Sequence, residues 1–187
     1  MKKILFLDID NTLLVTKDMF IYIITKTDKI KLNTAEYANF SFNNLKNIVI
    51  DYSDFDNPSK IENSFYNSEP LYDNLKIIDK YVKNGWELGI LTARGEEKII
   101  KKNIINFLKR HLKNDFKLNK SNIYAVGDRE LEYYGNDVYY KKLFILRKYL
   151  KSYEKVCLID DSKKIGNLIN KYNNIGTTIK KIDFINV

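Results

Sequence analysis

A run of apolar residues that stops at two acids is the clearest pattern in the chain. Positions 4–7 are all apolar, and Asp8 and Asp10 follow with one residue between them. A short continuous apolar run is typical of a strand buried on both faces, as in a parallel sheet. Side chains alternate along a strand, so both acids are expected on one side of its C-terminal end, where ligands bind in open α/β sheets. The alternative is an ordinary turn, since Asp and Asn are common turn formers.

Similar apolar runs recur along the chain and alternate with segments that have the period of an amphipathic helix. Strands are predicted at residues 86–91, 122–126, 155–159 and 176–184, and helices at residues 71–82, 96–111, 141–150 and 165–172. Strands that alternate with helices indicate a parallel sheet with helices on both faces. The pattern therefore predicts a single α/β domain, residues 1–187, with a sheet of about five strands.

The segment between the first strand and the first of these helices, residues 16–70, does not follow this alternation. Two β-rich runs flank Thr27 and Asp28, which predicts a hairpin, and a helix over 34–47 and a strand over 47–52 are expected to follow. Residues 51–70 are predicted to be irregular. The aromatic residues in this last stretch, Phe55, Phe65 and Tyr66, are interpreted as packing residues, with a substrate contact as the alternative. The whole segment is predicted to be a small flap or cap.

Composition narrows the class of protein. The chain has 187 residues, of which 44% are apolar and 30% charged, values typical of a globular domain with one core. The formal net charge is +8, but residues 1–70 carry 8 Lys/Arg against 10 Asp/Glu, whereas residues 71–187 carry 24 against 14. A basic surface attracts nucleic acid and other polyanions. The alternative is compositional, because the chain is rich in Lys, Asn and Ile throughout.

Single cysteine and histidine residues exclude several kinds of site. With Cys157 alone, no internal disulfide forms, which fits a reducing compartment. With His111 alone, neither a histidine-based triad nor a zinc cluster is possible. The first apolar run ends at Asp8, too soon for a signal sequence, and no run is long enough to span a membrane. A cytoplasmic protein without a membrane partner is expected, and its oligomeric state stays open.

Polar residues that suit metal and phosphate chemistry follow three of the predicted strands. They are Asp8, Asp10 and Thr12 after the first, Thr92 after the second, and Asp160 and Asp161 after the fourth. If these strands are neighbours, the carboxylates converge, and like charges about 4 Å apart cost roughly 4 kcal/mol at an effective dielectric of 20. A divalent cation with oxygen ligands removes this cost, and Mg²⁺ is the usual ion beside phosphate.

A lysine is also expected at this site to balance the charge of a bound phosphate. The candidates are Lys141 and Lys142, at the start of the helix that precedes the fourth strand. Lys142 is favoured, because Leu146 lies one turn later on the apolar face of that helix. Thr92 and nearby backbone amides are expected to bind phosphate oxygens.

Four short motifs, in this order, resemble those of the haloacid dehalogenase superfamily. They are Asp8-Ile-Asp10-Asn-Thr12, Leu91-Thr92-Ala-Arg94, a helix-borne lysine and Ile159-Asp160-Asp161-Ser162. The resemblance spans residues 3–169 and implies a Rossmann-like sheet and Mg²⁺-dependent phosphoryl transfer through an aspartyl-phosphate. An acid two residues after the nucleophile, followed by a threonine, is the pattern of the phosphatases in this superfamily.

The resemblance also implies a role for each motif residue. Asp8 is expected to be the nucleophile and Asp10 the general acid and base. Mg²⁺ is expected to bind the Asp8 carboxylate, the Asp10 backbone carbonyl and the Asp160 carboxylate, with Asp161 as a further ligand or a supporting residue. Thr92 and Lys142 are expected to bind the transferring phosphoryl group.

Two other functions and several substrates are open at this stage. A receiver domain places its phosphoacceptor after the third strand, which here is Asp128, much too late in the chain. A non-catalytic scaffold of the same fold would have lost Asp8, Asp10 or the lysine. The segment that contains Arg94 resembles phage-type phosphatases and the phosphatase half of polynucleotide kinase/phosphatase. Nucleotides or nucleic-acid terminal phosphates are therefore the leading substrates, ahead of sugar phosphates and phosphoproteins. Arg94 is expected either to contact substrate or to pair with Glu96 or Glu97.

Overall fold

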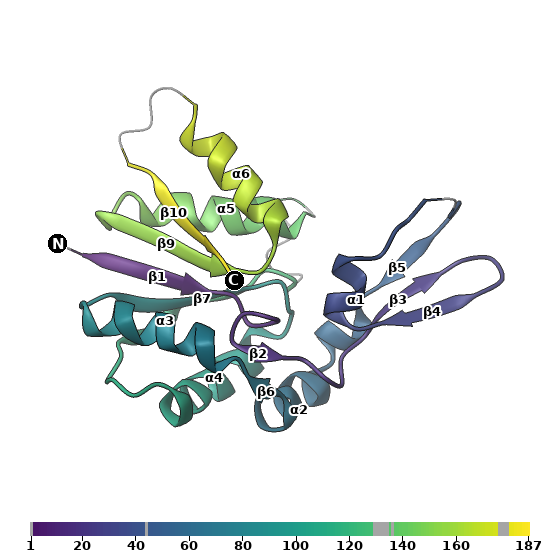
Figure 1. Ribbon diagram of the computed structural model, residues 1–187, viewed down its shortest axis with the longest axis horizontal. Helices are drawn as coiled ribbons and strands as arrows, with labels where there is room; N and C mark the ends of the chain where they lie inside the picture. The colour runs from purple at the N-terminus through teal and green to yellow at the C-terminus, as the bar shows by residue number, and fades with distance from the viewer. Residues whose placement is uncertain (1, 44, 129–134, 136, 176–179) are drawn as a thin grey trace.

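A parallel five-stranded sheet forms the centre of the molecule (Figure 1). The computed structural model describes the chain except residues 1, 44, 129–134, 136 and 176–179. The strand order is β10-β9-β1-β7-β8, and all neighbours run parallel. The strands are β1 (Lys3–Leu7), β7 (Glu87–Thr92), β8 (Leu118–Ala125), β9 (Lys155–Asp160) and β10 (Ile182–Asn186). The predicted Rossmann-like α/β fold is confirmed, although positions 176–179 of the last predicted strand lie outside the described residues.

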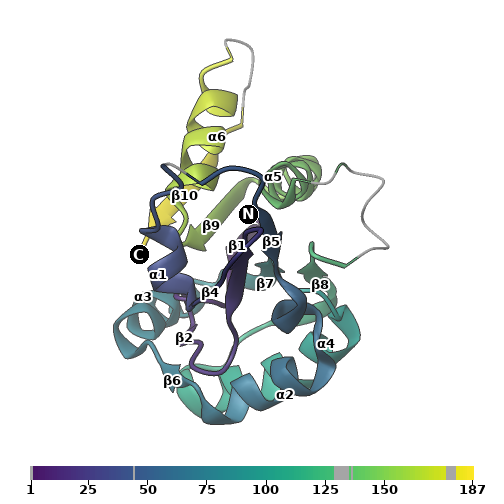
Figure 2. The ribbon, with the colours of Figure 1, turned by 90° about the vertical axis from the view of Figure 1, so that its right-hand side faces the viewer.

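Helices cover both faces of this sheet (Figures 1 and 2). They are α3 (Tyr72–Lys83) and α4 (Glu97–His111) on one face, and α5 (Val138–Tyr149) and α6 (Lys163–Asn173) on the other. Alternation along β1 supplies both cores, because Leu5 and Leu7 pack toward α3 and α4 whereas Ile4 and Phe6 pack toward α5 and α6. Within the described part of the chain, no helix is both long and apolar enough to cross a membrane.

The order of the strands creates a switch point beside β1. From β1 the chain goes to β7 and β8 on one side, then crosses to β9 and β10 on the other side. Ligands of open α/β sheets bind at the carboxyl ends of the strands where the order reverses. In the register of β1 with β9, Leu7 lies beside Ile159, so Asp8 and Asp160 are level with each other. The fold therefore brings the first and last acidic motifs together.

The insertion, residues 16–70, leaves the body through a short antiparallel pair, β2 (Leu14–Val15) with β6 (Glu69–Pro70). Beyond it, a flap (residues 20–52) projects to one side of the body (Figures 1 and 2). The flap contains an antiparallel sheet of β3 (Ile21–Ile24), β4 (Lys29–Leu32) and β5 (Val49–Asp51), with α1 (Thr34–Ala38). The predicted hairpin and third strand are confirmed, whereas the predicted helix over 34–47 ends at Ala38.

The prediction that residues 51–70 are irregular is wrong. A 3₁₀ turn (Ser53–Asp56) leads into α2 (Pro58–Asn67), which begins with Pro58 in its first turn and the Asn57 side chain accepting from the Lys60 amide at 3.1 Å. Ile61 and Phe65, four residues apart, bury one face of α2 in the core, and Phe65 packs edge-on against Phe107 of α4. Phe65 is thus a packing residue, as interpreted from the sequence.

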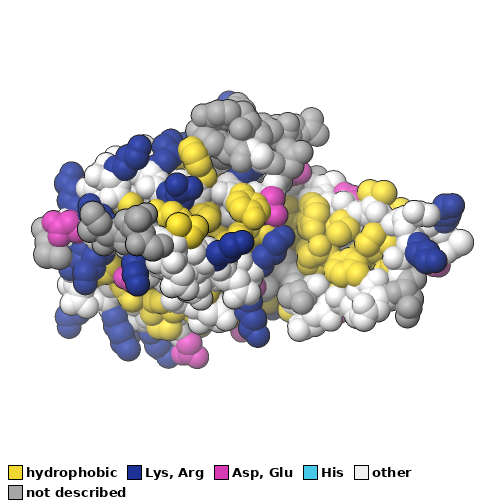
Figure 3. All heavy atoms as spheres, turned by 90° about the horizontal axis from the view of Figure 1, so that it is seen from above, with side chains coloured by type: hydrophobic (Ala, Val, Ile, Leu, Met, Phe, Trp, Pro, Cys, Tyr) yellow, Lys and Arg dark blue, Asp and Glu magenta, His cyan; other side chains and the backbone are white. Residues whose placement is uncertain are grey.

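Basic and hydrophobic side chains are distributed differently on the surfaces of the body and the flap (Figure 3). Lysine and arginine side chains are spread over the visible face of the body rather than gathered in one patch, whereas hydrophobic side chains gather on the flap. A dispersed basic surface fits the compositional interpretation of the net charge on this face.

Candidate active site at the carboxyl edge of the sheet

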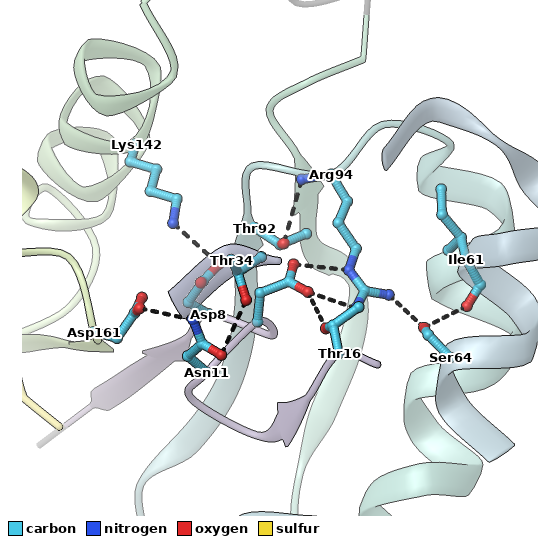
Figure 4. A network of polar contacts seen from close by, with 11 residues as sticks. Asp8, Asn11, Thr16, Thr34, Ile61, Ser64, Thr92, Arg94, Lys142 and Asp161 are labelled. Atoms are coloured by element: carbon cyan, nitrogen blue, oxygen red, sulfur yellow. Dashed lines mark hydrogen bonds and ion pairs between the residues drawn. The ribbon is translucent and has the colours of Figure 1, made fainter. Parts of the chain in front are cut away.

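Asp8 lies at the end of the central strand, against a buried lysine. Its backbone amide donates to the Ile159 carbonyl at 3.0 Å, which extends the pairing of β1 with β9 by one residue. Its carboxylate accepts from Lys142 Nζ at 3.0 Å (Figure 4). The same ammonium donates to Asp160 at 2.7 Å. Asp8, Asp160 and Lys142 are all buried. The first and last strands of the predicted site thus meet through Lys142.

The two candidate lysines on α5 have different partners. Lys142 contacts the two carboxylates, whereas Lys141 Nζ donates to the Val126 backbone carbonyl at 3.0 Å. Both side chains are buried, because α5 packs over the end of the sheet. Of the two candidates, the geometry favours Lys142 as the residue beside Asp8.

Three carboxylates form a group that suits a metal ion. One oxygen from each of Asp8, Asp160 and Asp161 lies within 4.8 Å of the others. The second Asp160 oxygen accepts from the Ser162 amide at 2.9 Å, which fixes its orientation. Within this group only Lys142 supplies a positive charge among the described residues, so two formal negative charges remain. An oxygen-rich site with excess negative charge is what Mg²⁺ requires.

Burial and the neighbouring charges shift the pKa values of the residues in this group. Burial raises the pKa of Asp8 to about 8 against the opposing charge of Lys142, and the Asp160 carboxylate adds to the rise. Burial, and then Asp160, also raise the pKa of Asp161. Burial alone would lower the pKa of Lys142, but Asp160 and Asp8 reverse the effect and raise it. The carboxylates would therefore gain from a further cation, and Lys142 stays charged.

Asp10 occupies a different environment from Asp8. Both of its oxygens accept from Arg94, from Nε at 2.9 Å and from Nη2 at 2.8 Å, and the Thr16 hydroxyl donates to one of them. Burial would raise the pKa of Asp10, but the charge and hydrogen bonds of Arg94 outweigh it and lower the pKa. Both oxygens of the Asp10 side chain accept from Arg94. The backbone carbonyl of Asp10 is therefore the atom left for its predicted contact with a metal ion.

Arg94 is fully buried and connects the site with the insertion. Its Nη1 donates to Ser64 Oγ of α2 at 2.6 Å, and Ser64 in turn donates to the Ile61 carbonyl at 2.7 Å (Figure 4). Its ion pair is with Asp10 rather than with the predicted Glu96 or Glu97. A substrate contact by Arg94 stays a prediction, and complete burial of the side chain argues against it.

The threonines of the first two motifs, Thr12 and Thr92, are both buried. Thr92 is buried at the end of β7, and its Oγ1 accepts from the Arg94 amide at a long 3.4 Å. The Thr12 hydroxyl is also buried and has no hydrogen-bond partner within the described part of the chain. Thr92 keeps its predicted place at the strand end, beside the loop that carries Arg94.

Asn11 lies at the site, although no role for it was predicted from the sequence. Its backbone is left-handed, with φ of 54°, a conformation that Asn adopts more readily than most residues. This turn aims its side chain at two partners: Nδ2 donates to Asp161 at 3.3 Å, and Oδ1 accepts from the Thr34 hydroxyl of α1 at 3.1 Å. The signal in the sequence is an Asn between Asp10 and Thr12, but its second partner lies in the flap and is not readable from spacing.

Comparison of the chain with protein-family models, curated proteins and solved structures found no match in any of the three. The case for a function rests on the site itself. The structure brings together Asp8, Asp160, Asp161 and Lys142 as one group, buried except for the partly exposed Asp161, as the sequence predicts.

Proposed function

We propose that the chain is a Mg²⁺-dependent phosphomonoester hydrolase that works through an aspartyl-phosphate, as the motif resemblance to the haloacid dehalogenase superfamily implies. The observation that carries the proposal is the pairing of the strand-end Asp8 with the buried Lys142, next to two more carboxylates. A nucleophile beside a fixed cation, within a cluster that needs a divalent ion, suits an anionic phosphate substrate.

The donor set fits Mg²⁺ as the required ion. Asp8, Asp160 and Asp161 would hold it, together with the Asp10 carbonyl, and hard oxygen ligands of this kind are those Mg²⁺ prefers. When bound, the ion would supply positive charge to the phosphoryl oxygens. The excess negative charge around Asp8 supports this assignment.

In the first step, Asp8 Oδ attacks phosphorus and the bond from phosphorus to the leaving oxygen breaks. The product is an acyl phosphate on Asp8, and the leaving oxygen takes a proton from a donor, for which Asp10 is the candidate. Charge spreads over the equatorial phosphoryl oxygens during this transfer. Lys142 and the Thr92 hydroxyl would stabilise them, because Lys142 contacts the Asp8 carboxylate from α5 and Thr92 ends β7, the strand next to β1.

In the second step, water attacks phosphorus of the acyl phosphate and Asp10 accepts its proton. The bond from phosphorus to Asp8 Oδ breaks, which releases inorganic phosphate and restores the Asp8 carboxylate. The lowered pKa of Asp10 suits this step, since Arg94 keeps Asp10 ionised and oriented. The first step instead needs a protonated Asp10, so leaving groups that depart without a proton, such as aryl oxides, are expected to react fastest.

The test is Mg²⁺-dependent hydrolysis of an aryl phosphate by the purified chain. Wild type is expected to release phosphate with Mg²⁺ and not with a chelator, and Asp8→Asn to lose at least about 100-fold in kcat, as nucleophile removal does. Asp183→Asn, an exposed acid on β10, is the matched control and should keep wild-type activity. Equal rates for wild type and Asp8→Asn would refute the proposal and favour a non-catalytic binding module.

A further inference from the structure

Four aromatic side chains on the flap form one contact cluster. Tyr37 packs edge-on against Phe42 and Tyr52, with ring centroids 5.9 Å apart in both pairs, and Phe40 packs edge-on against Phe42 at 5.2 Å. The hydroxyls of Tyr37 and Tyr52 are 2.5 Å apart. Phe42 and Tyr52 nevertheless remain 37% and 44% exposed. These four residues are called the aromatic cluster below.

The aromatic cluster stands next to the acidic site. Helix α1 begins at Thr34, whose hydroxyl donates to Asn11, and Asn11 donates to Asp161. Tyr37 is three residues after Thr34 and therefore lies on the same face of the helix, one turn away. The side chain of Asn11 and one turn of α1 therefore separate the carboxylates from Tyr37, the first ring of the cluster.

A tyrosine at the start of α5 lies on the same helix face as Lys142. Tyr139 lies in the first turn of α5, three residues before Lys142 and on the same helix face. Burial and the hydrogen bond with Tyr37 raise the pKa of Tyr52, and the Tyr139 phenol adds to this effect. Lys164 Nζ lies 4.4 Å from the Tyr139 ring centroid, so a positive charge is also close.

Phe42 and Tyr52 are not part of the buried core of the flap. The flap sheet buries Ile21 and Ile23, which alternate along β3, whereas Phe42 and Tyr52 keep more than a third of their surface open. Figure 3 shows hydrophobic side chains gathered on the exposed surface of the flap. In an edge-to-face pair one ring covers a face of the other, so a flat aromatic group would stack on the surface of Phe42 and Tyr52 that stays exposed.

We propose that the aromatic cluster stacks the base of a nucleoside phosphate whose phosphate is bound at Asp8. This inference rests on the proposed function and names its substrate class. Stacking on aromatic rings tolerates any base, because every base has a π face, and phenol hydroxyls supply polar partners for its edge. Two aromatic residues of 51–70 for which a substrate contact was the alternative interpretation have other contacts in the structure. Phe65 is buried, and the Tyr66 hydroxyl donates to Asn103.

The experiment compares kcat/KM for adenosine 5′-monophosphate with that for ribose 5-phosphate, which lacks the base. Wild type is expected to prefer the nucleotide by at least tenfold. Tyr37→Leu and Phe42→Leu should each lower this ratio about tenfold, the effect of losing a stacking contact, while ribose 5-phosphate turnover persists and reports a folded site. Tyr37→Phe keeps the ring and should keep the ratio. Tyr72→Leu, an exposed aromatic on α3, is the matched control.

Further arms separate the possible outcomes. Adenosine 3′-monophosphate and a 3′-phosphorylated oligonucleotide test whether the base belongs to a free nucleotide or to a nucleic-acid end. Hydrolysis of an aryl phosphate and ribose 5-phosphate, with a nucleotide preference that is absent or unchanged in both Leu variants, overturns this inference and leaves the proposed function standing. If no ester is hydrolysed, the proposed function fails, and calorimetry decides the inference: nucleotide binding must weaken about tenfold in Tyr37→Leu and not in Tyr37→Phe.

Discussion

Arg94 donates to both oxygens of the Asp10 carboxylate, at 2.9 and 2.8 Å, and so joins the loop after β7 to the loop after β1. The guanidinium is fully buried and the Asp10 side chain is 14% exposed. A two-point contact fixes both the charge and the orientation of the carboxylate. The pair therefore sets the state in which Asp10 meets the substrate.

Removal of Arg94 should destabilise the chain strongly. Arg94→Met leaves Asp10 buried without its cation, and breaking a buried pair in this way costs about 3–5 kcal/mol. Because the folded pKa of Asp10 is lowered, its contribution to stability is present above the unfolded value near 3.9 and is lost as the pH falls below it. Urea unfolding at pH 7 and pH 3 should show a smaller gap between the two proteins at pH 3. Arg147→Met, an exposed control on α5, should change stability by less than about 0.5 kcal/mol.

The same pair should control the acidic limb of the rate profile. With Arg94→Gln, the charge that lowers the pKa of Asp10 is gone, so the pH at which Asp10 becomes a base should rise. The measurement is kcat/KM for an aryl phosphate between pH 4 and pH 8, in a variant shown to be folded at each pH. A profile that keeps the wild-type limb would contradict the assignment of Asp10 as the base.

Asp8 should make the metal-free chain less stable as the pH rises. Its folded pKa, about 8, lies far above the unfolded value near 3.9, so between these values the folded state holds a proton that the unfolded state has released. The unfolding free energy therefore falls across this window, by up to about 1.4 kcal/mol per pH unit. In chelator, Asp8→Asn should lack this fall, and its advantage over wild type should grow from pH 5 to pH 8. Parallel curves for the two proteins would rule out the elevated pKa.

Mg²⁺ should stabilise wild type through the three acids. At about 100 times the dissociation constant, a ligand that binds only the folded state adds about 2.7 kcal/mol. Asp160→Asn should reduce this gain, because it removes one of the three candidate ligands. Lys142→Met should be destabilised in chelator and regain stability when Mg²⁺ is added, whereas Lys141→Met should respond to Mg²⁺ as wild type does. Thermal unfolding with and without the ion measures all four, and no Mg²⁺ effect on wild type would contradict the metal site.

Asn11 offers a test that separates backbone from side-chain effects. Asn11→Gly tolerates the left-handed φ of 54° but loses the bonds to Asp161 and Thr34, whereas Asn11→Ala also strains the backbone. Ala should therefore be less stable than Gly by about 1–2 kcal/mol. Urea unfolding of the two variants measures the difference, and equal stability would show that the backbone here is not strained.

The convergence of Asp8 with Asp160 was predictable from the sequence because it depends on strand ends. Asp8 and Asp160 follow continuous apolar runs, and parallel strands bring their carboxyl ends to one edge whatever lies between them in the chain. The choice of Lys142 over Lys141 likewise followed from the face of one helix. These are local properties, so a periodic pattern was enough.

The insertion could not be predicted to the same extent, because its structure depends on distant partners. Helix α2 is amphipathic, but Ile61 and Phe65 are its only buried apolar residues, and their burial depends on packing against α4. The pairing of Arg94 with Asp10 depends on how two loops 84 positions apart meet, while Glu96 and Glu97 were nearer in sequence. Contacts of this kind are properties of the assembled fold and leave no spacing signal.

The contacts of Arg94 and Asp10 also bear on how freely the insertion can be exchanged. Thr16 at its beginning and Ser64 near its end both bond to this pair, so the insertion is held to the Asp10 side of the site at two points. Residues 20–52 should therefore be replaceable as a unit, by design or during divergence, provided that these two hydroxyls stay in place. Exchange of all of residues 16–70 would remove Thr16 and Ser64, which contact the Arg94–Asp10 pair, together with the flap. The boundary of an exchangeable segment therefore lies inside the insertion.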